Sequence, residues 1–340
     1  MPVQTGPDTG KPVKKDIILN RNDIKNILGG DKKAVAEALN LLENSRPDRF
    51  SLAQDLIEQL STNARPERHV IGVTGPPGVG KSTLISRVIQ EYRGRNQTVG
   101  IISVDPSSRK SGGALLGDRA RITHDPADPG IFIRSMAAGR HLGGLAWRTR
   151  HCLTVFEAVY DVIILETVGV GQSETEIDEV VDTVVFVVQP GSGDALQFMK
   201  AGIMEIPHVL VINKADQKSL AVKALNDLKT VGSFGRVDNF DWKPEVIMTS
   251  ALQGWGQDEL IVVLKKHLDY LSCHGIAKRR RQNRICWIFL LYKERFGNFG
   301  IEALGGEEKI LQLIAQLDII NPFYGLQRLT DKLWKTVGHQ

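Results

Sequence analysis

Short apolar runs alternate with amphipathic stretches through the middle of this 340-residue chain, from residue 69 to residue 268. Several of these runs are apolar almost throughout, which is typical of parallel strands that are buried on both faces. The alternation predicts an α/β fold with a doubly wound, mainly parallel sheet, in which ligands bind beyond the carboxyl ends of the strands. The expected strands are Val70–Thr74, Val99–Val104, Ile131–Arg134, Val162–Glu166, Thr183–Val188, Val209–Ile212 and Glu245–Thr249.

Helical periodicity replaces this alternation at both ends of the chain. Apolar residues recur every three or four positions between residues 21 and 64, with Asp31 and Ser51 as candidate helix caps. Helical periodicity returns after Leu260 and is interrupted by glycines over Gly297–Gly306. The sequence after this interruption predicts two further helices.

The composition of the chain adds little to the predicted fold, but it argues against some functional classes. The chain is 42% hydrophobic and 24% charged, as is usual for a globular protein, and its net charge of +4 is small for a protein that binds nucleic acid. The three cysteines have no metal-ligand spacing, which favours a reducing cytoplasm. No secretory signal and no apolar run long enough to span a membrane are visible, so we expect neither a membrane nor a nucleic-acid partner.

The sequence Gly75-Pro-Pro-Gly-Val-Gly-Lys-Ser-Thr83 lies between the first predicted strand and a helical stretch. It matches G-x-x-x-x-G-K-[ST], the phosphate-binding loop of nucleotide hydrolases, in the context that the motif requires. Its glycines let backbone N–H groups point at phosphate oxygens, and the helix N-terminus adds a partial positive charge. We expect Lys81 to reach the β- and γ-phosphates and Ser82 to bind Mg²⁺. The expected phosphate-binding residues are Gly75, Pro76, Pro77, Gly78, Val79, Gly80, Lys81, Ser82 and Thr83.

The sequence Asn213-Lys-Ala-Asp216 follows the sixth predicted strand directly and indicates a guanine site. The Asp216 carboxylate can accept hydrogen bonds from guanine N1–H and from the 2-amino group, and adenine lacks this donor set. Asn213 would support the pocket, and the Lys214 stem would pack on the purine face. Ser250 and Ala251 would place a backbone N–H near the guanine carbonyl, although this pair alone is equally consistent with a helix cap.

Two further strand ends carry carboxylates near the phosphate-binding loop. Glu166 ends an apolar strand and is followed by Gly169, where a carboxylate near Mg²⁺ and a glycine that senses the γ-phosphate belong. Asp105 ends another strand, and a glycine-rich connection leads from it to Asp118. Such a loop can be ordered by Mg²⁺ and γ-phosphate and released on hydrolysis, so we interpret it as a switch rather than an ordinary surface loop.

Together these segments resemble the MeaB/ArgK family of GTPases, within the SIMIBI class, over about residues 30–270. The run from Glu166 to Glu174 is specific to that family rather than to GTPases in general. The segments that carry the resemblance are Gly75–Thr83, Val104–Ser108, Gly112-Gly113, Leu116–Asp118, Leu142–Gly144, Glu166–Glu174 and Asn213–Asp216. We expect four parts: a flexible arm (1–20), an N-terminal helical extension (21–66), a P-loop GTPase domain (67–272) and a C-terminal helical segment that is a candidate for dimer formation (273–340).

The resemblance implies a GTP-hydrolysing chaperone that assists and protects an adenosylcobalamin-dependent acyl-CoA mutase of the methylmalonyl-CoA mutase type. It also implies a cytoplasmic homodimer that uses GTP/GDP and Mg²⁺, with Lys81, Asp105 and Glu166 in catalysis. By position, the metal neighbourhood would comprise Ser82, Asp105, Asp118 and Glu166. The stretch from Gln189 to Lys200 resembles an additional switch of that family.

Other functions stay open at this point. A metallochaperone GTPase that delivers nickel would need clustered His and Cys ligands, and only Cys273-His274 is adjacent. An RNA-binding GTPase could use Lys278–Arg281, although a short basic run is usually a solvated helix face. Use of adenine, and a transport-associated ATPase or kinase, are the remaining alternatives.

Overall fold

The computed structural model describes most of the chain outside several connections and the two termini. The described residues are 21–43, 49–63, 65, 67–105, 122–137, 147–167, 177–191, 206–232, 242–317 and 322–338. The predicted arm (1–20), Asp118, Gly169 and the stretch from residue 192 to Lys200 lie outside them.

Seven strands in the described part of the chain form one fully parallel sheet, which confirms the predicted doubly wound α/β fold. The strand order is β3-β2-β4-β1-β5-β6-β7, so the strand before the phosphate-binding loop is central. The strands are β1 (His69–Thr74), β2 (Val99–Asp105), β3 (Ile131–Ala137), β4 (Val162–Glu166), β5 (Thr183–Val188), β6 (Val209–Ile212) and β7 (Glu245–Met248).

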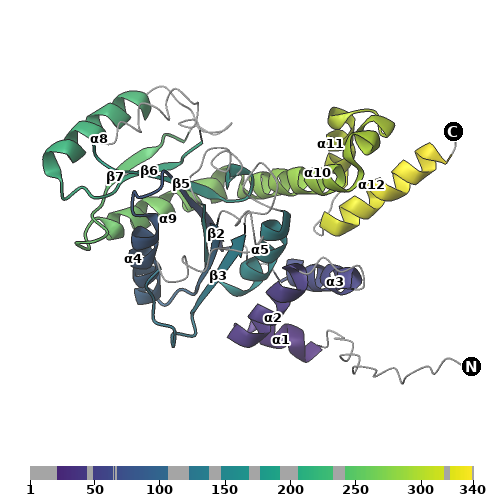
Figure 1. Ribbon diagram of the computed structural model, residues 1–340, viewed down its shortest axis with the longest axis horizontal. Helices are drawn as coiled ribbons and strands as arrows, with labels where there is room; N and C mark the ends of the chain where they lie inside the picture. Colours follow the sequence, from purple (N-terminus) through teal and green to yellow (C-terminus); the bar gives the residue numbers. More distant parts are fainter. Residues whose placement is uncertain are drawn as a thin grey trace, which may run out of the picture.

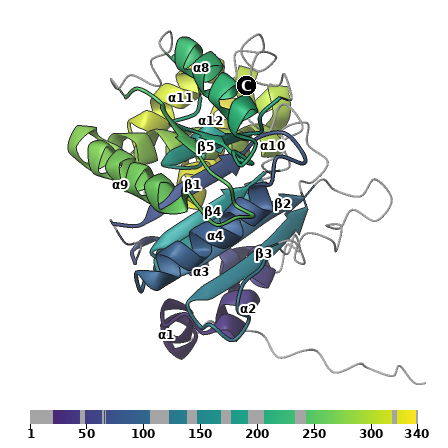
Figure 2. The same cartoon turned by 90° about the vertical axis from the view of Figure 1, so that its left-hand side faces the viewer.

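Helices cover both faces of the sheet, because alternate side chains of each buried strand point to opposite faces. On β5, Val185 and Val187 belong to the core beneath α4 (Lys81–Gly94) and α9 (Gln257–His274). Phe186 and Val188 face the other side, where α8 (Lys218–Gly232) packs, and α5 (Trp147–Val159) covers the same face further along. Figure 2 shows α4 and α9 over one face of the sheet.

The N-terminal helices form an outer layer on α5, as their apolar periodicity predicts. They are α1 (Arg21–Leu28), α2 (Lys32–Glu43) and α3 (Phe50–Ser61), and their buried residues join the core around α5. Asp31 caps α2 as predicted, since its Oδ1 accepts a 2.7 Å hydrogen bond from the Ala34 backbone N–H. The predicted cap at Ser51 was wrong: α3 begins one residue earlier, with Arg49 at the N-cap, so Ser51 lies inside the helix.

The C-terminal helices form an arm that extends from the sheet (Figure 1). They are α10 (Ile276–Ala303), α11 (Glu307–Ala315) and α12 (Pro322–Val337), and they share an apolar core of their own. The predicted glycine-rich interruption over Gly297–Gly306 is right only at its two ends. The helix α10 kinks at Gly297, whose φ of 56° and ψ of −155° are not helical, but it continues to Ala303 and ends before Gly305 and Gly306. The proposed division of the chain into domains stays a prediction.

Candidate functional site

The loop between β1 and α4 has the backbone that a phosphate-binding loop needs. Gly75, Gly78 and Gly80 have φ values of 136°, 81° and 92°, a region that favours glycine. A Cβ on Gly75 would lie 2.1 Å from the Val187 carbonyl oxygen, and one on Gly80 would lie 2.5 Å from Asn213 Nδ2. Gly80 is also the N-cap of α4 and has no side chain to cap it. No N-cap side chain therefore accepts a hydrogen bond from the first-turn N–H groups of α4, and these groups can donate to an anionic ligand.

Lys81 is held against this loop by the loop's own carbonyl groups. Its Nζ donates to the carbonyl oxygens of Gly75, at 2.7 Å, and Pro76, at 3.0 Å, and the side chain is buried. The amine is therefore held at the loop, where the predicted β- and γ-phosphate contacts would form.

Ser82 and Glu166 meet at the carboxyl ends of β1 and β4. The Ser82 hydroxyl donates to Glu166 Oε1 at 2.8 Å, and the Ser103 hydroxyl from β2 donates to Oε2 at 3.0 Å. Register explains the contact, because Glu166 pairs with Val73 of β1 on one side and with Ser103 of β2 on the other. Sequence reasoning gave Ser103 no role, and the structure shows that it orients the carboxylate.

The oxygen atoms of Ser82 and Glu166 fit Mg²⁺, a hard cation that usually takes one or two protein ligands plus water and phosphate oxygens. Asp105 ends β2 next to them, although its side chain lies outside the described residues. Within the described ranges, no group of three or more His, Cys, Asp or Glu side chains could hold a metal ion.

Asn213 ties the phosphate-binding loop to the neighbouring strand end. Its Nδ2 donates to the Val79 carbonyl at 2.9 Å, and its Oδ1 accepts from the Ala251 backbone N–H at 3.1 Å and the Thr249 hydroxyl at 3.2 Å. From α4, Arg87 Nε donates to the Ala251 carbonyl at 3.0 Å. The sequence predicted a supporting role for Asn213, but the contributions of Thr249 and Arg87 have no local motif.

Lys214 and Asp216 lie at the same edge of the sheet. Lys214 has a left-handed φ of 59°, and its Nζ donates to the Gly78 carbonyl at 2.8 Å and to Gln189 Oε1 at 2.6 Å. Asp216 is exposed, and its Oδ1 accepts a 2.7 Å hydrogen bond from the Ser250 hydroxyl. The hydroxyl fixes one carboxylate oxygen, so the exposed carboxylate is available to the two N–H donors of a guanine.

The parallel sheet and the loop between β1 and α4 define a P-loop nucleotide hydrolase. The chain matches the family described as methylmalonyl Co-A mutase-associated GTPase MeaB over residues 35–301, and it belongs to that family. It is therefore a GTPase.

Individual relatives agree with this assignment. A protein of Pyrococcus horikoshii whose name assigns it to the GTPases is 41% identical over 268 residues, which cover 77% of this chain and 82% of that protein. The GTPase ArgK of Escherichia coli is 32% identical over 91% of this chain and 95% of its own length. The mouse protein named methylmalonic aciduria type A homolog, mitochondrial, is 32% identical over 79% of this chain and 68% of its own length.

Among solved structures, a crystal structure of an LAO/AO transport system kinase matches with a TM-score of 0.68 at 27% identity. The match covers 93% of this chain and 99% of that one. In the described part of the present chain, no helix is long and apolar enough to cross a membrane.

Proposed function

We propose that this GTPase is a chaperone that times the loading of adenosylcobalamin into an acyl-CoA mutase of the methylmalonyl-CoA mutase type and protects the loaded enzyme. The contact between Glu166 and Ser82 carries the proposal. Glu166 is the first residue of the family-specific run to Glu174, so this run begins at the atoms that would sense Mg²⁺ and γ-phosphate. The family description, a mutase-associated GTPase, supports the same partner.

Different residues of the chain would then have different roles in hydrolysis. Lys81 would leave the carbonyl groups that now hold it and neutralise charge on the β- and γ-phosphates. Ser82 and Glu166, with Asp105 and Asp118, would hold Mg²⁺, which neutralises charge developing on the phosphate oxygens. Phosphoryl transfer depends mainly on positioning, so we expect slow hydrolysis until the mutase positions a switch residue.

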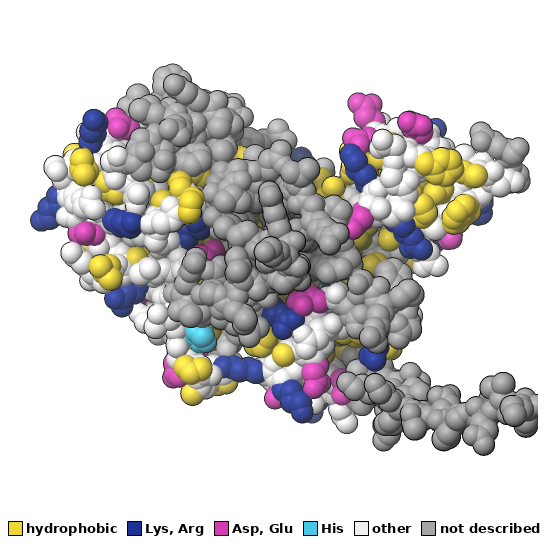
Figure 3. Space-filling model, viewed as in Figure 1, with side chains coloured by type: hydrophobic (Ala, Val, Ile, Leu, Met, Phe, Trp, Pro, Cys, Tyr) yellow, Lys and Arg dark blue, Asp and Glu magenta, His cyan; other side chains and the backbone are white. Residues whose placement is uncertain are grey.

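We also propose that two copies associate through the arm formed by α10, α11 and α12. Four large hydrophobic residues of this arm are exposed: Leu290, Phe299, Tyr324 and Trp334. Figure 3 shows hydrophobic side chains gathered on this part of the surface. Exposed apolar surface of this kind is usual at interfaces between subunits. The three cysteines all lie in the described part of the chain and form no disulfide, which is consistent with the cytoplasmic location that we propose.

Single-turnover GTP hydrolysis, measured with and without the cognate mutase, tests the proposed partnership. We expect the mutase to raise the rate at least about tenfold, because it supplies positioning that the free GTPase lacks. The control is an unrelated cobalamin enzyme at the same concentration, which should leave the rate unchanged. Equal rates with and without the cognate mutase would contradict the proposal.

A further inference from the structure

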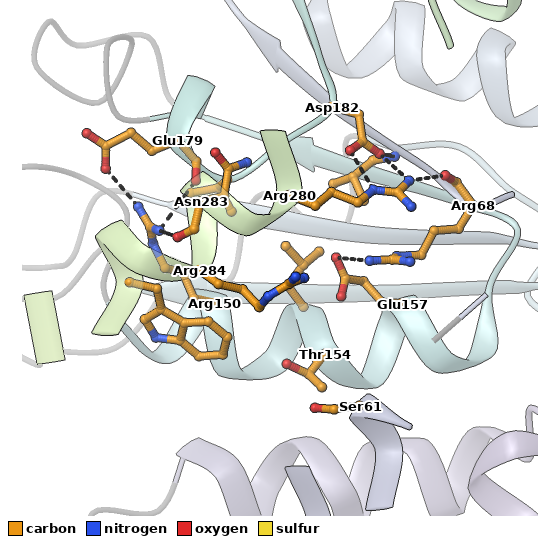
Figure 4. A pocket seen from close by; sticks show the side chains of 14 residues that line it. Ser61, Arg68, Arg150, Thr154, Glu157, Glu179, Asp182, Arg280, Asn283 and Arg284 are labelled. Carbon is orange, nitrogen blue, oxygen red and sulfur yellow. Dashed lines mark hydrogen bonds and ion pairs between the residues drawn. The ribbon is translucent and has the colours of Figure 1, made fainter. Parts of the chain in front are cut away.

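A second polar pocket lies at the opposite edge of the sheet from the phosphate-binding loop. Arg68 and Asp182, which line it, immediately precede β1 and β5, whereas Gly75 follows β1. The remaining walls come from α3, α5, the short 3₁₀ helix Ile177–Glu179 and α10. The pocket is partly open to solvent and has a volume of about 100 Å³; we call it the arginine pocket (Figure 4).

Four arginines and three carboxylates line the arginine pocket, and three of the arginines are paired with the carboxylates. The N–O distances are 3.1 Å for Arg68–Glu157, 3.0 Å for Arg150–Glu179 and 2.9 Å for Arg280–Asp182. Arg280 also donates to the Arg68 carbonyl at 2.7 Å. Each carboxylate of the pocket is thus paired with one arginine, and the guanidinium of the fourth arginine has no carboxylate of its own.

The remaining guanidinium belongs to Arg284. Among the described residues it has no ion-pair or hydrogen-bond partner, and its Nε is buried without an acceptor. Figure 4 shows its side chain reaching into the middle of the pocket, between the Arg150–Glu179 and Arg68–Glu157 pairs.

Burial lowers the pKa of Arg284. The charge of Glu157 opposes this shift, and the charges of Arg68, Arg280 and Arg281 add to it. Arg284 is partly buried, and the one carboxylate that acts on its charge, Glu157, is already paired with Arg68. Its charge is therefore incompletely compensated, so this position favours an anion.

We propose that the arginine pocket binds a small oxyanion, a phosphate or a carboxylate group, with Arg284 as its principal ligand. A guanidinium has a planar fork of N–H donors that matches the oxygens of either group. Thr154 and Ser61 line the same pocket and offer hydroxyl donors to the remaining oxygens. The volume of the pocket exceeds that of a single water site and accommodates a group of this size.

Binding at this place would fasten the C-terminal arm to the GTPase core. Arg284 lies on α10, whereas Arg68, Thr154 and Asp182 belong to the core around β1, α5 and β5. An oxyanion between them would add charge-assisted hydrogen bonds across this junction. Because the phosphate-binding loop lies at the other end of β1, this site is separate from that of the nucleotide.

Thermal unfolding of the full chain tests the proposal. The protein is first saturated with Mg²⁺ and a non-hydrolysable GTP analogue, so that added phosphate cannot bind the phosphate-binding loop. Inorganic phosphate, acetate and chloride are then titrated at equal ionic strength. We expect phosphate or acetate, but not chloride, to raise the Tm of the wild type by about 2–4 °C when its concentration is well above Kd. The more effective of the two identifies the source of the oxyanion.

Arg284→Gln should abolish this rise, and without added anion its Tm should exceed that of the wild type because an incompletely compensated, partly buried charge has been removed. Lys278→Gln is the matched control: it removes an exposed charge from the same helix and should respond like the wild type. Calorimetric titration should show at least a tenfold weaker affinity for the oxyanion in Arg284→Gln. No anion-specific rise in the wild type, or an equal rise in Arg284→Gln, would overturn the proposal.

Discussion

The two ends of strand β1 carry sites that are built in different ways. At the carboxyl end, the phosphate-binding loop and the start of α4 are contiguous in the sequence. Asn213 and Glu166 each form a hydrogen bond with that one segment. At the amino end, the arginine pocket joins residues as far apart as Arg68 and Arg280, which are separated by 212 positions. Chemistry that is concentrated in one loop can be recognised in a sequence, whereas chemistry assembled from distant side chains becomes visible only in the folded chain.

The two ends of β1 also differ in their electrostatics. The candidate nucleotide site contains an exposed carboxylate, Asp216, and a helix N-terminus that no N-cap side chain caps. The other end contains a buried ion pair in which burial alone would raise the pKa of Asp182, but the hydrogen bond and charge of Arg280 outweigh burial and hold that pKa below its usual range. We therefore expect mutations at the amino end to change stability first, and mutations at the carboxyl end to change activity first.

The largest expected effect is on stability, from Arg280→Met. This change leaves Asp182 as an unpaired buried charge, so we expect the free energy of unfolding to fall by about 3–5 kcal/mol. Urea unfolding measures it. The matched control is Lys266→Met, which breaks an exposed ion pair with Glu245 and should cost less than about 1 kcal/mol. Similar losses of unfolding free energy in the two variants would contradict the expected difference between a buried and an exposed ion pair.

Lys81→Ala should act on hydrolysis and leave the fold in place. Removing a positive group that stabilises the transferring phosphoryl group costs about 10²–10³-fold in rate, as for other donors that stabilise developing negative charge. Single-turnover hydrolysis under saturating GTP measures the loss, and an unchanged urea midpoint shows that folding is intact. Wild-type hydrolysis by this variant would mean that Lys81 has no part in the reaction.

The amino end of β1 should also make stability depend on pH. Burial lowers the pKa of His69 from 6.5 to about 4, although the Asp182 charge opposes the shift. The folded state therefore favours neutral His69, so its contribution is fully present above pH 6.5 and is lost as pH falls from 6.5 towards 4. The loss amounts to about 3 kcal/mol.

Urea unfolding of the wild type and of His69→Gln at several pH values measures this contribution. Glutamine can keep a hydrogen bond to the Thr183 hydroxyl, which lies 2.6 Å from His69 Nε2, but it does not titrate. The variant should lose less stability than the wild type over this pH range. Parallel curves for the two proteins would show that His69 does not titrate in this way.

The same contrast explains what could be predicted from the sequence. All seven strands followed from apolar runs such as Val162–Glu166, because a doubly covered parallel sheet needs continuous hydrophobic strands. The cap at Asp31 was predicted correctly. The cap at Ser51 was not, because the N-cap of α3 is Arg49, whose side chain makes no capping hydrogen bond. Ser103 could not be assigned, because its contact with Glu166 depends on the register of β2 beside β4.

The arginine pocket had no signal in the sequence. Lys278–Arg281 is an ordinary basic run on a helix, and nothing local indicates that Arg280 meets Asp182 or that Arg284 points into a cavity. These contacts depend on where α10 crosses the start of β5, which is a property of the tertiary packing rather than of any local pattern.

The most direct test of the guanine site is the nucleotide preference of Asp216→Asn. An amide at this position can donate a hydrogen bond, which suits the additional carbonyl of xanthine and opposes the 2-amino group of guanine. Affinities for GDP and xanthosine diphosphate, measured by calorimetry, should shift by at least about tenfold in favour of xanthosine, which corresponds to the loss of about one charged hydrogen bond. An unchanged preference for GDP in the variant would contradict the assignment of Asn213–Asp216 as the base-binding segment.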